Sequence, residues 1–433
     1  MRKFARIVIA LALTAMVPAC QTNIYYPNEL DRFESLTSPS TVLLIYGVAF
    51  NNLNSYIQGN LNTVARNKLP APGSDQVILS FTNFSDGSLS WKKENPSHLI
   101  RYSTFDGKVR RDTVLTIEAG RKAVDPDVMK EVLDYVRSHY KAERYGLILS
   151  SHGSGWLPAG YVYTEEQDRW MHYHELGSGV ANKIPWNSVK RFPAFSGPLT
   201  KTFGAEYHGE YNVSAEVYEM SVPSLAKAIG TGWDFIVLDA CFMGCVEVAW
   251  ELRNCADELC ISAAEVLADG FNYRTMADIV FRRGEVAENI CRSYFDHYSN
   301  HSSYRSATIA NVRTAGLENL KNVCKTLVGK YKTELSEADT SAIQVFSQNG
   351  RKWFYDLRDV FVKSGISPED DALLCDALDN CISYKAATAR IMDNIDIRTF
   401  CGLSMFLPTK ADTVLINAYR ENSWNKEVNL VEE

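Results

Sequence analysis

The sequence predicts an α/β fold built on an open, mostly parallel β-sheet with helices on both faces. Short apolar runs, typical of strands buried on both faces, alternate with segments of helical periodicity. Two of these runs end abruptly in polar and small residues, one at His152 and one at Asp239-Ala240-Cys241. In open α/β sheets functional groups gather at the carboxyl ends of the strands. The pattern therefore predicts both the fold class and the edge of the sheet that carries the site.

Strands are expected where β-branched and other apolar residues run almost without interruption between turn signals. Asp106-Gly107, a two-residue turn signal inside an alternating stretch, predicts one hairpin. The expected strands are residues 41–50, 76–83, 98–117 (the hairpin), 145–151, 235–238, 258–264, 306–311 and 402–408.

Helices are expected where apolar residues recur every three to four positions between those strands. Asp125 and Pro126 mark one start, because Asp caps helices and Pro suits the first helical position. Residues 157–218 show little periodicity and many Gly, Pro, Asn and aromatic residues, which predicts a surface insertion. The expected helices are residues 51–68, 125–142, 220–229, 246–252, 284–332 (broken by the strand at 306–311), 353–362 and 368–392.

Composition describes an ordinary globular chain of 433 residues, 46% hydrophobic and 22% charged, without repeats or low-complexity linkers. A net charge of −7 and the lack of basic clusters interleaved with aromatics argue against a nucleic-acid partner. No C-x-x-C pair or zinc-ligand spacing occurs among the ten cysteines. His172 and His174 stand in a polar stretch without a third ligand, so no metal site is expected.

The first twenty residues have the layout of an export signal. Basic residues precede an apolar run at 7–17 that is short for a membrane span. Val17-Pro18-Ala19-Cys20 resembles the lipobox of bacterial lipoproteins, in which the peptide is cut before a cysteine that becomes lipidated. We therefore expect residues 1–19 to be a signal peptide and 20–39 a tether, with Cys20 anchoring an exported protein to the bacterial cell envelope, at the outer membrane or surface. An ordinary signal peptide is the alternative.

Cys241 and His152 are the candidate nucleophile and its base. A cysteine between a strand and a helix N-terminus lies near backbone N–H groups and the positive end of a helix dipole, which favour the thiolate. Histidine is the usual partner of such a thiol. Gly153 has no side chain, so its N–H and that of Cys241 would be open to a substrate oxyanion. The alternative is a turn histidine and a buried structural thiol.

Asp239 is a candidate binding residue. It directly follows the apolar run Ile236-Val237-Leu238, where an unpaired carboxylate is costly to bury. It should therefore either cap the following helix or face a cation.

These motifs resemble the paired histidine and cysteine motifs of the clostripain family of cysteine peptidases, relatives of caspases and gingipains with a caspase-like fold. The resemblance extends over most of the chain from about residue 40. It implies a catalytic domain over 40–290, including the insertion at 157–218, and a mainly helical C-terminal region with a late strand over 291–433. The matching stretches are His152-Gly153-Ser154-Gly155-Trp156, Leu238-Asp239-Ala240-Cys241-Phe242-Met243-Gly244 with Glu247, and residues 44–46, 51–53, 268–271, 355–357 and 402–404.

The resemblance also implies an activity. His152 and Cys241 would form a dyad that hydrolyses protein or peptide substrates after Arg or Lys through an acyl-enzyme. Asp239 would line the specificity pocket together with Asp269, and two carboxylates around one basic group would give charge-assisted hydrogen bonds. The competing class is a non-catalytic surface-binding lipoprotein that keeps the fold.

Two further properties of the family bear on this chain. Some members cleave themselves between the two motifs, and here Lys183, Lys190, Arg191 and Lys201 are basic candidates; a lid that is never cut is the alternative. Calcium dependence occurs in the family, although the sequence has no D-x-[DN]-x-[DN]-G loop. No other cofactor is expected.

Overall fold

The structure is a computed structural model. It describes residues 39–85, 95–158, 204–210, 214–301, 304–347, 352–392, 394–409, 411 and 413–432, together with the backbone of 90–91 and 171–176. These residues lie in one compact unit that begins at Pro39. The expected signal peptide, the tether, Cys20 and the basic candidates between Lys183 and Lys201 lie outside the described residues.

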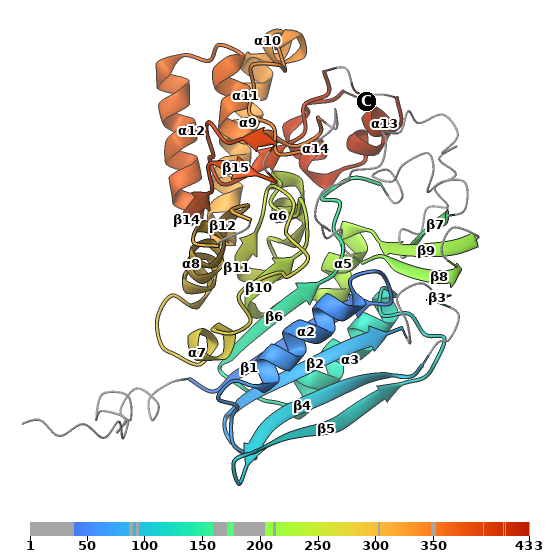
Figure 1. The fold of residues 1–433 in the computed structure, drawn as a ribbon. Helices are drawn as coiled ribbons and strands as arrows, with labels where there is room; N and C mark the ends of the chain where they lie inside the picture. Colours follow the sequence, from blue (N-terminus) through green and yellow to red (C-terminus); the bar gives the residue numbers. More distant parts are fainter. Residues whose placement is uncertain are drawn as a thin grey trace, which may run out of the picture. The chain divides into compact units, whose positions relative to one another are not determined.

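Among the described residues, a nine-stranded sheet forms the centre of the fold (Figure 1). From one edge to the other it contains β14 (Ile382–Ala387), β12 (Thr308–Arg313), β11 (Ala256–Ile261), β10 (Trp233–Asp239), β6 (Arg144–Ser150), β1 (Thr41–Ala49), β2 (Gln76–Phe84), β4 (Ser97–Phe105) and β5 (Lys108–Ile117). The strands from β11 to β2 are parallel to one another. The strands outside them are antiparallel to their neighbours. The predicted open, mostly parallel sheet is confirmed.

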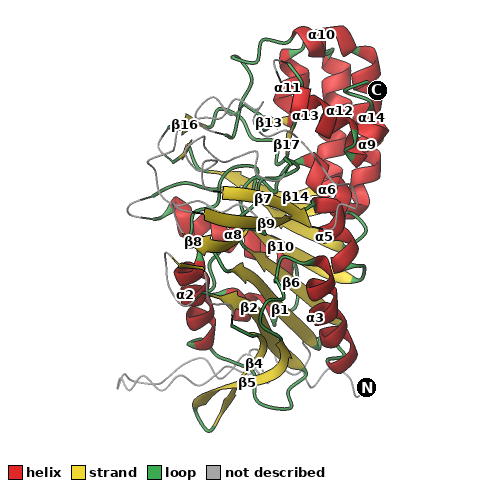
Figure 2. Ribbon diagram, turned by 90° about the vertical axis from the view of Figure 1, so that its right-hand side faces the viewer, coloured by secondary structure: helices red, strands yellow, loops and turns green. Residues whose placement is uncertain are grey.

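Helices cover both faces of this sheet, and the side view separates them (Figure 2). On one face lie α2 (Asn54–Ala65) and α8 (Val286–Ser299); on the other lie α3 (Pro126–His139), α5 (Val222–Ile229) and α6 (Val246–Leu252). The short α7 (Met276–Val280) packs against α8. None of the helices in the described ranges is both long enough and apolar enough to cross a bilayer.

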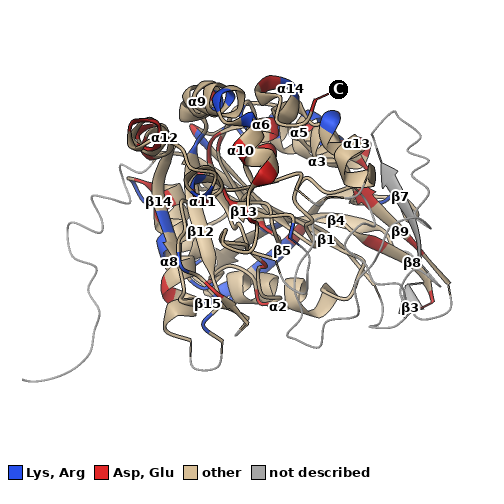
Figure 3. Ribbon diagram, turned by 90° about the horizontal axis from the view of Figure 1, so that it is seen from above, with Lys and Arg blue, Asp and Glu red and all other residues tan. Residues whose placement is uncertain are grey.

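A mainly helical C-terminal part follows, as expected. Within it α9 packs against both α12 and α14, and α14 also contacts α6. Acidic and basic residues are interspersed over these helices (Figure 3), and Lys321 pairs with Glu318 at 2.6 Å. The elements are η2 (Thr314–Gly316), α9 (Leu317–Lys330), α10 (Lys332–Glu337), α11 (Leu357–Lys363), α12 (Pro368–Cys381), α13 (Thr413–Arg420) and α14 (Ser423–Val428).

The C-terminal part also supplies strands β12 and β14 to the central sheet. The expected strand at 306–311 corresponds to β12. The expected helix over 368–392 was wrong beyond Cys381, where α12 ends and β14 begins. β14 pairs with β12 at the sheet edge, and this tertiary pairing overrides the high helix propensity of Lys385-Ala386-Ala387.

Part of the expected insertion at 157–218 is folded. It contributes three strands of a second sheet, in which the order is β3 (Ser90–Trp91), β8 (Glu206–Glu210), β9 (Ser214–Met220) and β7 (Met171–Leu176). Ala205, Ala215 and Val217 are fully buried, so this part of the segment packs into the body instead of forming an exposed loop. Two short pairs complete the strands: β13 (Tyr355–Asp356) with β17 (Ser404–Met405), and β15 (Arg390–Ile391) with β16 (Ile395–Asp396).

Two local signals read from the sequence have the expected geometry. The side chain of Asp125 accepts a hydrogen bond from the Asp127 amide, and Pro126 opens α3. Asp106 and Gly107 join β4 to β5 with φ values of 51° and 67°, as a tight hairpin turn requires.

Candidate active site

His152 and Cys241 follow two neighbouring strands at equivalent positions. Strands β6 and β10 are parallel and adjacent, and Ser150 pairs with Asp239 at their carboxyl ends. Each candidate catalytic residue comes two positions after its member of this pair. The register therefore brings the histidine turn and the cysteine turn to one place on the sheet edge.

The two turns contact each other through Gly155. This glycine has φ +60°, and a Cβ placed there would lie 2.8 Å from the Phe242 carbonyl oxygen and 2.6 Å from the Phe354 ring. Real Cβ atoms do not approach so closely, so only glycine allows the turn after His152 to lie against the turn after Cys241. Gly153, the predicted oxyanion residue, is buried within the same turn.

The cysteine turn has an unusual backbone that its neighbours hold in place. Phe242 has φ +57°, which is an outlier for a bulky residue and is kept only where surrounding contacts enforce it. Its amide donates to the Ala264 carbonyl at 3.1 Å, and its ring stacks on Phe354 with centroids 4.7 Å apart. The Gly244 amide donates to the Ser262 carbonyl at 2.7 Å. The loop after β11 therefore fixes the turn that carries Cys241.

The Cys241 thiol is fully buried. The Val266 amide nitrogen lies 3.3 Å from Sγ and donates to it, and Sγ in turn donates to the Val266 carbonyl oxygen at 3.6 Å. The helix-dipole prediction needs correction, because α6 begins only at Val246 with Cys245 as its N-cap. The intervening turn separates Cys241 from the helix, and the Val266 amide of the neighbouring loop is the donor instead. Because Cys241 is fully buried, a substrate carbonyl can reach Sγ only if the residues that cover the thiol move aside.

His152 is also buried, with 5% of its surface exposed. Its Nε2 lies 2.5 Å from Oδ1 of Asn52, and its ring stacks on Tyr207 with centroids 6.0 Å apart. The preceding Ser151 hydroxyl donates to the Val48 carbonyl at 2.9 Å, which fixes the start of the turn. Sequence analysis missed both ring contacts. The Asn pair after the first strand was a visible signal for Asn52, whereas nothing in the sequence marked Tyr207.

Asp239 is fully buried at the end of β10. Its Oδ2 accepts hydrogen bonds from the Ser150 and Tyr273 hydroxyls, each at 2.8 Å. Burial and the neighbouring Asp239 carboxylate raise the pKa of Tyr273 well above its usual value, so this hydroxyl stays protonated as a donor. The N-cap of α6 is Cys245, which excludes the helix-capping alternative for Asp239.

Asp269 lies exposed in a turn of the loop after β11. Gly270, with φ +71°, donates to the Leu267 carbonyl at 2.8 Å and closes the turn. Tyr298 of α8 donates to the Gly270 carbonyl at 2.7 Å. Burial, with Tyr294, Asp239 and Asp269 adding to it, raises the pKa of Tyr298 well above its usual value.

A sequence profile of the clostripain family matches residues 45–183 and 211–431, which is most of the chain. The chain belongs to the clostripain family. It is therefore a member of a family of cysteine peptidases, which are hydrolases. The profile leaves 184–210 unmatched, within the insertion at 157–218.

Clostripain from Hathewaya histolytica is 26% identical over 281 residues, which are 58% of this chain and 45% of that protein. The chain thus matches less than half the length of this relative. An inactive zymogen of a C11 protease from Parabacteroides distasonis has a TM-score of 0.67 at 22% identity, covering 90% of this chain and 99% of that one. A secreted C11 cysteine protease from Bacteroides thetaiotaomicron, solved with an irreversible peptide inhibitor, gives 0.67 at 21% identity over the same shares. These likenesses confirm the predicted fold.

Glu247, part of the family motif, connects the cysteine turn to the C-terminal part. Its carboxylate accepts hydrogen bonds from the Phe406 amide at 2.8 Å and the Tyr419 hydroxyl at 3.0 Å. Burial raises the pKa of Glu247. Burial and the Glu247 carboxylate together raise the pKa of Cys245 well above its usual value. Glu247 thus ties α6 to Phe406 and Tyr419 of the C-terminal part.

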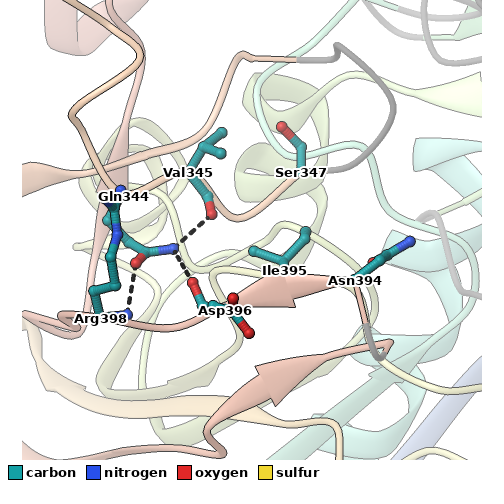
Figure 4. Close-up of a pocket in the computed structure, with 7 residues that line it drawn as sticks. All are labelled: Gln344, Val345, Ser347, Asn394, Ile395, Asp396 and Arg398. Atoms are coloured by element: carbon teal, nitrogen blue, oxygen red, sulfur yellow. Dashed lines mark hydrogen bonds between the residues drawn. The ribbon is translucent and has the colours of Figure 1, made fainter.

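A separate pocket of about 450 Å³ lies near β15 and β16 (Figure 4). Gln344 crosses one side of it: its amide nitrogen donates to the carbonyls of Val345 and Asp396, and its oxygen accepts from the Arg398 amide at 2.8 Å. The described residues that line the pocket include neither a cysteine nor a histidine. Over the described ranges, no three His, Cys, Asp or Glu residues form a group that could hold a metal ion; the side chains of His172 and His174 fall outside those ranges.

Proposed function

We propose that the chain is an exported, lipid-anchored endopeptidase that hydrolyses peptide bonds after Arg or Lys. Cys241 is the nucleophile and His152 its base. The observation that carries this proposal is the Ser150–Asp239 pair in the register of β6 and β10, because it sets the thiol turn and the imidazole turn at equivalent points of one sheet edge. Family membership supports the same reaction class.

The reaction has two halves. His152 takes the proton of the Cys241 thiol as Sγ attacks the substrate carbonyl, and then gives it to the leaving amine, which leaves a thioester. A water molecule then attacks the thioester while His152 accepts its proton, and the carboxylate product departs as the thiol reforms. The amides of Gly153 and Cys241 hold the oxyanion in both halves; loss of one such donor typically costs about 100- to 1000-fold in rate.

Asp239 and Asp269 select the basic side chain in this proposal. Asp239 supplies a buried negative charge whose orientation Ser150 and Tyr273 fix through Oδ2. Asp269 is exposed and offers a carboxylate for direct contact. A guanidinium or ammonium group satisfies both charges, whereas a neutral side chain leaves them unpaired and is rejected.

Specific substrates test this assignment. The chain from Cys20 onward is incubated with chromogenic peptides that end in Arg, Lys or Asp. The buffer contains a reductant that keeps Cys241 as a free thiol, and the assay is run with and without calcium. We expect cleavage of the Arg and Lys substrates and none of the Asp substrate. Asp239→Ala should lose the basic preference. Failure of the wild type to cleave any basic substrate would refute the peptidase assignment, and full Arg cleavage by Asp239→Ala would refute only the pocket.

A further inference from the structure

Asn52 lies in the turn between β1 and α2, and this turn is fixed on both sides. The buried Asn51 amide nitrogen donates to the carbonyls of Val48 at 3.0 Å and Ala205 at 2.7 Å. Its oxygen accepts from the Leu53 amide at 2.8 Å. Asn54 donates to the Ser85 carbonyl at 2.8 Å. Asn52 therefore stands on a rigid turn at the carboxyl end of the strand next to β6.

The side chain of Asn52 reaches the catalytic histidine. Its Oδ1 lies 2.5 Å from Nε2 of His152. An amide oxygen can only accept a hydrogen bond, so this contact places the ring hydrogen on Nε2. In the neutral ring Nδ1 is then the proton acceptor, which is the form that a base for the Cys241 thiol needs.

The same turn also supports the face of the imidazole. Tyr207, which stacks on His152, is held by its amide, which donates to the Phe50 carbonyl at 2.9 Å. Asn51 fixes the neighbouring Ala205. The segment from Phe50 to Asn52 thus controls the His152 ring at one edge directly and at one face through Tyr207.

We propose that Asn52 is a positioning residue for catalysis: it fixes the tautomer and orientation of His152 so that Nδ1 serves the Cys241 thiol. This inference rests on the proposed role of His152 as the base. Asn52 carries no charge, so it orients the ring without holding a proton on it.

Three variants test the proposal. Asn52→Ala removes the acceptor, Asn52→Asp keeps the size and an acceptor but adds a charge, and Ser55→Ala, at an exposed residue in the first turn of α2, is the control. Since Asn52 is an exposed residue, its replacement should leave the thermal unfolding temperature close to that of the control. For Asn52→Ala we expect kcat to fall by about 10- to 100-fold with little change in KM, because a displaced base acts on the chemical step.

The pH dependence of kcat/KM and the tautomer of the His152 ring distinguish a positioning role of Asn52 from a merely structural one. In Asn52→Asp a carboxylate favours the imidazolium, which cannot accept the thiol proton, so the acid limb of kcat/KM should move to higher pH. In protein with ¹⁵N-labelled histidines, the signals missing from His152→Ala belong to His152. They should show hydrogen on Nε2 in the wild type and a mixture of tautomers in Asn52→Ala.

The tautomer of His152 can be measured without any substrate turnover. It therefore distinguishes failure of the proposed peptidase function from failure of the Asn52 proposal. A wild type that cleaves nothing but shows the Nε2–H tautomer refutes the proposed function and leaves the contact intact. An unchanged His152 tautomer in Asn52→Ala, with kcat within about twofold of Ser55→Ala, would overturn the positioning role. If Asn52→Ala does not fold, Asn52→Asp decides: an unmoved acid limb counts against the proposal.

Discussion

Replacement of Gly244 by alanine tests how tightly the nucleophile turn is held. A Cβ at this position would lie 2.4 Å from the Ala263 nitrogen and the Ser262 carbonyl carbon, and 2.8 Å from the Ser262 oxygen. All three atoms are backbone, so no side chain can rotate away. Because ordinary contacts begin at 3.4 Å, the turn and the loop after β11 must separate by about 1 Å.

That separation has two consequences of predictable size. Overpacking of this kind costs about 1 to 3 kcal/mol of unfolding free energy. The displacement also loosens the hydrogen bond from the Gly244 amide to Ser262 and the donor from Val266 to Cys241. A shift of about 1 Å in a catalytic group can cost roughly 100-fold in kcat.

The assay compares Gly244→Ala with Gly59→Ala. Gly59 lies inside α2, and its Cβ would meet nothing within 4 Å, so the control should be as stable as the wild type or more stable by about 1 kcal/mol. Denaturant unfolding and kcat for an Arg substrate are measured on all three proteins. A folded Gly244→Ala with wild-type kcat would refute the claim that close packing of this turn positions Cys241.

Three further predictions concern the specificity pocket, the buried Glu247 and the membrane anchor. Tyr273→Phe removes one donor to Asp239, and since a hydrogen bond to a charged group contributes about 1.5 to 3 kcal/mol, kcat/KM for Arg substrates should fall by at least about tenfold; an unchanged value contradicts the pocket. Burial raises the pKa of Glu247 above its ordinary value of 4.5, so between the unfolded-state and folded-state pKa values the folded protein holds a proton that the unfolded chain releases. Wild-type stability relative to Glu247→Gln should therefore fall as the pH rises above 4.5. If the unfolding free energies of the wild type and Glu247→Gln change in parallel with pH, this prediction is wrong. Cys20→Ala should move the protein from the detergent-extracted membrane fraction to the soluble fraction, and a wild type found soluble would rule out the anchor.

The features predicted from sequence are those that local chemistry decides. The Asp125–Pro126 helix start and the Asp106-Gly107 turn depend on residues adjacent in the chain. The ends of strands β6 and β10 were visible because each apolar run stops at a residue that can react. Their adjacency in the sheet followed from the fold class, and the register confirms it.

The features that were missed depend on contacts between distant segments. Asn52 reaches His152 across 100 positions of the chain, and Tyr207 belongs to a segment without sequence periodicity. β14 is a strand only because the edge of β12 is there to pair with it. The donor at the Cys241 thiol comes from Val266, in a loop that periodicity cannot place, so the sequence pointed instead to the nearest helix.

Covalent labelling tests the central claim most directly. The reduced wild-type protein is treated with an irreversible peptide ketone that ends in Arg, and the modified peptide is located by mass spectrometry among the ten cysteines. We predict one equivalent of label on Cys241, much slower labelling in His152→Ala, and none with the same reagent ending in Asp. Label on another cysteine, or no label on the active protein, would contradict the assignment of Cys241 as the nucleophile.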